Sequence, residues 1–170
     1  MKKNSTVRLK ALRKDIATTP VLAYHGYGTG RIFEDDLISQ HIETCGNVSF
    51  TRNAKIQVPG SLIGSDYPYD SETIEVDALV LRKPKRASAV VRSGYEIKYQ
   101  SCSGTAEDKI VASAYRLSLL IKANKLDRGF IVLGGNAWTP LPLYIAASIH
   151  PNVKLISEIT FAKMAARGVL

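Results

Sequence analysis

The hexapeptide 95–100 has residue types and spacing that suit a charged catalytic cluster. It reads Tyr-Glu-Ile-Lys-Tyr-Gln, and in a β-strand successive side chains alternate between the two faces. Glu96, Lys98 and Gln100 would therefore share one face, while the apolar and aromatic residues between them would join a hydrophobic core. A carboxylate and an ammonium group would stand side by side, about 6–7 Å apart along the strand.

A second carboxylate, Asp77, lies on the preceding predicted strand, nineteen residues before Glu96. If the two strands pair as a hairpin, Asp77 reaches the same site, and two converging carboxylates bind a hard cation such as Mg²⁺ through oxygen. Lys98 would then orient or deprotonate an attacking water. The alternative is a cross-strand salt bridge, a common arrangement for Glu and Lys two residues apart on an exposed strand.

The elements that must position these residues indicate an α/β domain. Helical spacing of apolar residues predicts helices over 6–17, 31–44, 105–121, 141–148 and 157–168. Alternation or short apolar runs predict strands over 73–81, 87–100, 130–133 and 153–156. Strands followed by a βαβα succession predict an α/β sandwich with a central mixed β-sheet flanked by helices.

The segment 47–70 is rich in Gly, Pro, Ser and Tyr, which predicts one short strand and a long loop. A loop of that length in a small domain is usually functional. We therefore expect the loop from Thr51 to Tyr69 to contribute to substrate recognition. Ser93-Gly94 is expected to bend or bulge the strand that carries Glu96.

Length and composition fit a single domain over residues 1–170. Apolar residues make up 45% of the chain and charged residues 22%, values that exclude a disordered or collagen-like protein. No apolar run reaches the roughly 18 residues of a membrane span, and the two cysteines do not form a disulfide framework. A cytoplasmic protein without membrane association is expected.

The net charge of +8 favours a polyanionic partner, because basic side chains that neutralise phosphates release condensed counterions. Basic residues gather in a predicted N-terminal helix within residues 1–20 and in a predicted turn at 82–86. This turn would either contact phosphate or form a solvated hairpin tip. The candidate nucleic-acid contacts are Lys10, Arg13, Lys14, Arg31, Arg52, Lys55, Arg82, Lys83, Lys85 and Arg86.

Asp77 followed by Glu96-x-Lys98 on the next strand, and then by a helix, resembles the PD-(D/E)XK superfamily of nucleases. The superfamily has the restriction-endonuclease-like fold, and the resemblance covers about 30–133. Residues 31–133 would be the catalytic core, with 140–168 as a C-terminal α/β part. Gly30-Arg31-Ile32-Phe33-Glu34 is similar to the first helix of many members. The sequence departs from the family pattern at Val76, where many relatives have Pro.

This resemblance implies Mg²⁺-dependent hydrolysis of phosphodiester bonds in DNA, with Mn²⁺ as a substitute for Mg²⁺. Asp77, Glu96 and the backbone carbonyl of Ile97 would hold the metal ion, and Lys98 would position water or stabilise charge on phosphorus. Glu34 would orient a metal-bound water or ligate a second ion. Gln100 matches a position that is often polar and active in relatives.

The function expected from this resemblance is that of a sequence-specific DNA endonuclease of restriction or homing type, from a bacterial, archaeal or phage setting. The close alternative is a Holliday-junction resolvase or a repair nicking enzyme. Two alternatives belong to another functional class. One is a non-catalytic nucleic-acid-binding protein with the same fold, and the other is an α/β binding module in which the motif is accidental. A homodimer or a higher homo-oligomer is expected, with the apolar stretch 138–144 as its interface or as part of the core.

Overall fold

A computed structural model describes residues 10–12, 14, 29–46, 48–84, 89–101 and 106–170. These ranges contain four α-helices, two single-turn helices and five strands. In chain order they are α2 (Thr29–Leu37), the π-helix η1 (Ile38–Ile42), β1 (Val48–Pro59), the 3₁₀ helix η2 (Gly60–Leu62), β2 (Ser71–Arg82), β3 (Val91–Tyr99), α3 (Ala106–Lys122), β4 (Arg128–Gly134), α4 (Pro140–Ile149), β5 (Val153–Ser157) and α5 (Glu158–Ala166). The predicted helix over 31–44 corresponds to α2 and η1 together. The short helix η2 was not predicted.

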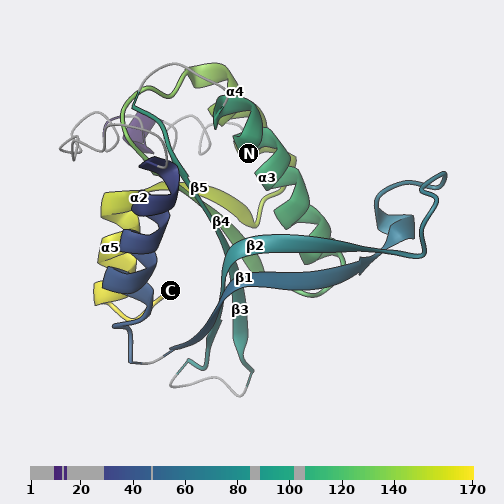
Figure 1. The fold of residues 1–170 in the computed structure, drawn as a ribbon, viewed down its shortest axis with the longest axis horizontal. Coiled ribbons are helices and arrows are strands. Elements are labelled where there is room, and N and C mark those ends of the chain that lie inside the picture. The colour runs from purple at the N-terminus through teal and green to yellow at the C-terminus, as the bar shows by residue number, and fades with distance from the viewer. Residues whose placement is uncertain (1–9, 13, 15–28, 47, 85–88, 102–105) are drawn as a thin grey trace.

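The sheet has the order β1-β2-β3-β4-β5. The first three strands pair antiparallel, and β3, β4 and β5 pair parallel. Helices α3 and α4 cover one face of this sheet and α2 and α5 the other (Figure 1). The protein is therefore an α/β fold with a five-stranded mixed sheet flanked by helices, as the order of predicted elements indicated.

Two hydrophobic clusters fill the two sides of the sheet. On one side, Ile110, Ala114 and Leu117 of α3 pack with Ile131 and other residues of the sheet. On the other side, α2, η1 and α5 pack against alternate residues of the same strands; this cluster includes Phe33, Ile38, Ala78, Val80, Tyr95, Ile97, Phe130, Val132 and Phe161. Tyr95 and Ile97 thus face away from Glu96, as the predicted alternation requires.

The prediction of one short strand and a long loop over 47–70 underestimated the strand. Residues Val48–Pro59 form a strand of twelve residues, all of which pair with β2 except Asn53. The alternation of Ala54, Ile56 and Val58 with polar residues explains the strand, since it buries one face of the β1–β2 hairpin. Figure 1 shows this hairpin reaching beyond the helices, and only its tip, 60–70, is irregular.

The predicted bulge at Ser93-Gly94 is absent. Both residues lie in an uninterrupted register with β2, in which Ser93 is opposite Val80 and Gly94 is opposite Leu79. Gly94 has a packing role instead, because a Cβ at this position would lie 2.5 Å from Leu126 Cδ1. The glycine lets Leu126 approach the strand closely.

The predicted N-terminal helix lies mostly outside the described residues, although 10–12 and 14 are helical and Leu12 is buried. Within the described residues, no helix has both the length and the apolar character needed to cross a membrane.

Candidate functional site

The strands β2 and β3 separate at the point where the predicted catalytic residues lie. Their last paired residues are Ala78 and Tyr95, whereas β3 continues beside β4 as far as Tyr99 opposite Gly134. The backbone N–H of Ile97 therefore has no β2 carbonyl to bind, and it donates to Asp77 Oδ2 at 2.6 Å. A side chain takes the place of a strand carbonyl, which fixes Asp77 beside β3.

The hairpin β1–β2 changes its packing at the same point. Asn53, which lies opposite Asp77, is missing from the pairing and has a φ of +46°. Ala78, on one side of this position, packs with α2 and α5, while Ala54 and Val76, on the other side, join the cluster around α3. The left-handed backbone of Asn53 thus accompanies a twist that places Asp77 between the two helical layers.

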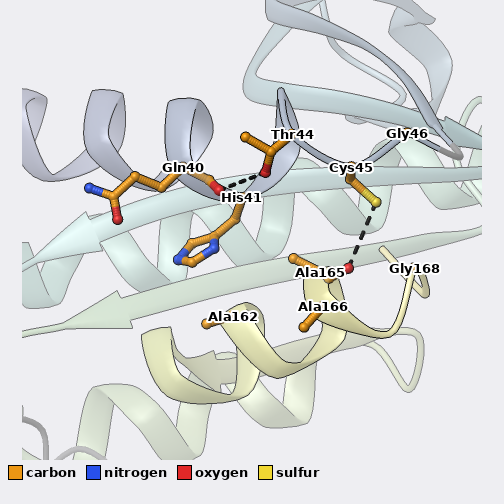
Figure 2. A pocket seen from close by; sticks show the side chains of 9 residues that line it. All are labelled: Gln40, His41, Thr44, Cys45, Gly46, Ala162, Ala165, Ala166 and Gly168. Atoms are coloured by element: carbon orange, nitrogen blue, oxygen red, sulfur yellow. Dashed lines mark hydrogen bonds between the residues drawn. The ribbon is translucent and has the colours of Figure 1, made fainter.

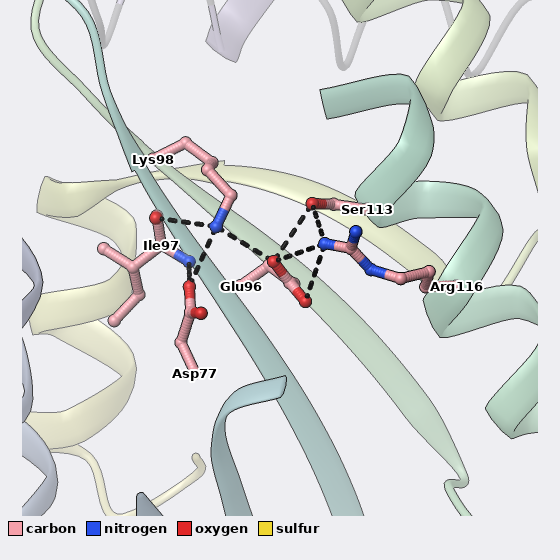
Figure 3. A network of polar contacts seen from close by, with 6 residues as sticks. All are labelled: Asp77, Glu96, Ile97, Lys98, Ser113 and Arg116. Atoms are coloured by element: carbon pink, nitrogen blue, oxygen red, sulfur yellow. Dashed lines mark hydrogen bonds and ion pairs between the residues drawn. The ribbon is translucent and has the colours of Figure 1, made fainter. Parts of the chain in front are cut away.

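Three oxygen atoms converge on the ammonium of Lys98 (Figure 3). Lys98 Nζ lies 3.0 Å from Asp77 Oδ2, 2.9 Å from Glu96 Oε2 and 3.1 Å from the carbonyl oxygen of Ile97. They belong to the three residues that the resemblance to PD-(D/E)XK nucleases implied as metal ligands. The sequence predicted the convergence of the two carboxylates, and the structure places a cationic group between them.

Helix α3 supplies two further partners for Glu96, whose side chain is only 2% exposed. Ser113 Oγ donates to Glu96 Oε2 at 3.0 Å, and Arg116 Nη2 lies 3.4 Å from the same oxygen and 3.5 Å from Oε1. Sequence reasoning did not find these two residues. The available signal was Ser113 itself, a polar residue between Ile110, Ala114 and Leu117 on the buried stripe of the predicted helix.

The electrostatics of Lys98 favour a protonated side chain. Burial by itself would lower the pKa of Lys98, but the charges and hydrogen bonds of Glu96 and Asp77 outweigh it and raise this pKa above its ordinary value. In this arrangement Lys98 is a cation and a hydrogen-bond donor. It would act as a base only after the two carboxylates had been neutralised by another charge.

Glu34 belongs to the same electrostatic environment from the α2 side of the sheet. Burial, and then the negative charge of Asp77, raise the pKa of Glu34 from 4.5 to about 7, and the charges of Lys98 and Glu96 also act on it. The role predicted for Glu34, which is to orient a water or to ligate a second ion, stays a prediction.

Gln100 lies apart from the three oxygens. Its Nε2 donates to the carbonyl of Ala137 at 2.7 Å and approaches Glu107 Oε1 at 3.5 Å, and Glu107 also accepts hydrogen bonds from Thr139. Gln100 is buried, and its Oε1 has no hydrogen-bond partner among the described residues. These contacts tie the end of β3 to the starts of α3 and α4, which is a structural role.

The predicted nucleic-acid contacts have mixed outcomes. Arg52 forms ion pairs with Asp35 and Glu43, Lys55 lies 4.0 Å from Glu75, and Arg82 Nε donates to the carbonyl of Leu170. Arg82 is the last residue of β2, so the predicted start of the turn at this residue was wrong. Lys10, Lys14, Arg31 and Lys83 are exposed, whereas Arg13, Lys85 and Arg86 lie outside the described residues.

Residues 51–59 of the recognition loop expected at Thr51–Tyr69 belong to strand β1, and 60–69 form the tip of the hairpin. From Ala54 to Val76 the hairpin has one basic residue, Lys55, and four acidic ones, Asp66, Asp70, Glu72 and Glu75. An acidic excess opposes contact with phosphate. The positive charge of the protein therefore lies outside the projecting part of the hairpin.

In the described ranges, no group of three or more His, Cys, Asp and Glu side chains is arranged to hold a metal ion. The donor set at Lys98 is of another kind, because it combines two carboxylates with a backbone carbonyl. Such hard oxygen donors suit Mg²⁺ or Mn²⁺, and they already hold a cationic group at distances of 2.9–3.1 Å. The residues therefore fit a divalent cation if the ammonium of Lys98 leaves.

A surface pocket of about 580 Å³ lies between η1 and α5, and none of the predicted catalytic residues lines it (Figure 2). Its lining includes His41, whose pKa is lowered by burial, and Cys45, whose Sγ is 3.8 Å from the carbonyl of Ala165. Small residues of α5 form the opposite wall. The pocket has no carboxylate and is separate from the cluster around Lys98.

Comparison with known proteins gives no family for this chain. No family model matches it, and no curated protein is significantly similar to it. Among solved structures, the crystal structure of AF1548, a protein of unknown function, is similar with a TM-score of 0.47 and 13% sequence identity. The match covers 81% of this chain and 62% of AF1548, so this chain spans less than two thirds of that protein. The function is therefore argued from the geometry of the site.

Proposed function

We propose that this protein is a metal-dependent DNA endonuclease of the PD-(D/E)XK type, with the restriction-endonuclease-like fold. The observation that carries the proposal is the convergence of Asp77 Oδ2, Glu96 Oε2 and the carbonyl oxygen of Ile97 on a single cationic group. The order of the elements supports it, since β2 carries Asp77, β3 carries Glu96 and Lys98, and α3 follows.

The charge balance of the site supports an anionic substrate. Asp77 and Glu96 are matched by Lys98 and Arg116, so the four groups are neutral together. A divalent cation added to this set leaves a positive excess of two charges, which the single negative charge of a phosphodiester would reduce. Bound at the three oxygens, such an ion would supply Lewis acidity at a phosphoryl oxygen.

In this proposal the residues of the chain have separate roles. Asp77, Glu96 and the Ile97 carbonyl hold the cation, for which we propose Mg²⁺ or Mn²⁺. The cation would displace the ammonium of Lys98 from these oxygens by its volume and its charge. Lys98 would then donate to the phosphate or to the attacking water. Glu34, with its raised pKa, lies within the electrostatic reach of both carboxylates and is available to accept a proton from water.

DNA is the proposed substrate because the chain has a net charge of +8, and the acidic hairpin tip leaves that excess on the rest of the molecule. Sequence-specific cutting is the first choice of role, and junction resolution or repair nicking is the second. A homodimer remains part of the proposal, and α4 presents the exposed residues Leu141, Tyr144 and Ile145 for such a contact.

A non-catalytic nucleic-acid-binding protein is the second candidate. The observation that favours it is the neutral network of Lys98 and Arg116 with the two carboxylates, which is complete without a metal ion. Such a protein would bind DNA equally well with Mg²⁺ and with EDTA.

The test is cleavage of supercoiled plasmid, a branched junction and linear genomic DNA, each with Mg²⁺ or EDTA. We expect cutting that requires Mg²⁺ and that Asp77→Asn reduces by roughly 10²–10³-fold. Asp70→Asn, an identical change at the hairpin tip, is the matched control and should cut as the wild type does. Binding without cutting on every substrate, or equal rates for the two variants, would contradict the proposal.

A further inference from the structure

Arg116 lies beside the buried carboxylate of Glu96, which it reaches from α3 (Figure 3). Its Nη2 contacts both oxygens of Glu96, yet its side chain is 43% exposed, whereas that of Glu96 is 2% exposed. The guanidinium therefore lies at the outer edge of the cluster formed by Asp77, Glu96 and Lys98.

The contact with Glu96 uses only part of the hydrogen-bonding capacity of Arg116. Glu96 Oε2 already accepts Lys98 at 2.9 Å and Ser113 at 3.0 Å, while Arg116 approaches it only to 3.4 Å. A guanidinium has five N–H donors, and the contacts of Arg116 with described residues all use Nη2. Its Nε is buried and has no hydrogen-bond partner among the described residues.

Exposure increases outward across the cluster. Glu96 is the deepest side chain, Lys98 and Asp77 are 18% and 20% exposed, and Arg116 is the most exposed. A phosphodiester bound at Lys98 would lie close to Arg116, because Lys98 Nζ and Arg116 Nη2 lie 2.9 Å and 3.4 Å from the same oxygen, Glu96 Oε2. The planar fork of arginine is well suited to bind two oxygens of one phosphate.

We propose that Arg116 binds a backbone phosphate of the DNA strand whose scissile bond lies at the Asp77–Glu96–Lys98 cluster. This inference rests on the proposed function, and it assigns a substrate-binding role to a residue of α3 that the motif does not include. The guanidinium keeps its contact with Glu96 through Nη2 and offers its outer N–H groups to the phosphate.

The test compares the salt dependence of DNA binding in EDTA, where cleavage is blocked, for wild type, Arg116→Gln and Lys122→Gln. Lys122 is the matched control, since it is exposed on the last turn of α3 and its loss removes one charge from the same helix. We expect Arg116→Gln to reduce the slope of log Kobs against log salt by about one and to weaken binding by roughly three- to tenfold. Lys122→Gln should change both by less.

Two further measurements separate the alternatives. Arg116→Lys keeps the charge and should keep the slope, which excludes a loss of binding through misfolding. Titration of Mn²⁺ into Arg116→Gln reports on Glu96 itself. A lower Mn²⁺ affinity with an unchanged DNA slope would make Arg116 a positioning residue for Glu96 and would overturn the phosphate assignment.

Failure of this inference and failure of the proposed function give different results. Equal slopes and affinities for Arg116→Gln and Lys122→Gln, in a wild-type protein that cuts DNA with Mg²⁺, overturn the role of Arg116 alone. A wild-type protein that neither binds nor cuts DNA overturns the proposed function and this inference together.

Discussion

Asp77 combines a structural contact and a candidate metal contact in one oxygen atom. Its Oδ2 accepts the N–H of Ile97 where β2 and β3 separate, and it also contacts Lys98 Nζ. A carboxylate oxygen has room for both interactions, because it has more than one lone-pair direction. The separation of two strands therefore both creates the site and orients its first carboxylate.

Glu34 is the residue from which we most directly expect a pH dependence of folding stability. Its pKa rises from 4.5 to about 7 because burial and the charge of Asp77 disfavour the ionised form. Below pH 4.5 the carboxyl is protonated in the folded and unfolded states alike and has no effect on stability. As the pH rises towards 7, the unfolded chain releases this proton while the folded protein retains it, which destabilises the folded state.

We therefore predict that Glu34→Gln stabilises the protein against urea at pH 7 by roughly 1–3 kcal/mol and has little effect at pH 4. Urea unfolding in EDTA across this pH range measures the effect. Glu72→Gln is a control with the opposite sign, because the hydrogen bond from Tyr67 lowers the pKa of Glu72 and stabilises its ionised form. A gain for Glu34→Gln that is equal at both pH values would contradict the assignment.

At the scale of elements, periodicity predicted most of what positions the site. Strands β2 and β3 and helix α3 lie where alternation and helical spacing placed them, and the opposite faces of Glu96 and Ile97 follow from the pleat. Strand β1 was predicted only as a short strand because the turn residues at 59–70 dominated the composition of the segment, although 54–58 alternate clearly.

The contacts that complete the site were beyond sequence reasoning for a physical reason. Ser113 and Arg116 reach Glu96 from α3, and this contact depends on how the helix packs across the sheet. Gln100 shares the parity of Glu96 and Lys98, but the strand ends at Tyr99 and the chain leaves the sheet. The alternation of side chains between the two faces of a strand therefore does not predict the direction of the Gln100 side chain.

The turn after β4 gives a prediction at the scale of elements. Gly135 has a φ of +77°, and a Cβ there would lie 2.1 Å from the carbonyl oxygen of Gln100. Both the backbone conformation and the contact with backbone atoms disfavour any side chain. We predict that Gly135→Ala lowers the free energy of unfolding by about 2–3 kcal/mol or more.

The matched control for this change is Gly64→Ala, where a Cβ meets nothing within 4 Å. This substitution should alter the free energy of unfolding by less than about 1 kcal/mol. Thermal or urea unfolding of the two variants compares them directly. Equal stabilities would show that the turn between β4 and α4 accommodates a side chain and does not fix the end of β3.

At the scale of the whole molecule, the fold determines where the charged groups lie. The sheet separates two apolar layers, and the charged cluster lies where β2 leaves β3, beside α3. The acidic hairpin projects from this body (Figure 1), so the basic excess belongs to the remainder of the chain. This distribution favours a polyanion that contacts the body of the molecule, where the cluster is located.

The central claim is that three oxygens now bound to Lys98 form a divalent-cation site in the intact protein. Isothermal titration of Mn²⁺ into wild type, Asp77→Asn and Lys98→Met tests it most directly. We predict one bound ion in the wild type, an affinity lowered at least about tenfold in Asp77→Asn, and an affinity at least equal to wild type in Lys98→Met, where the competing ammonium is absent. A wild-type protein that binds no Mn²⁺, or an Asp77→Asn variant that binds it as the wild type does, would contradict the account and leave the network as a structural ion cluster.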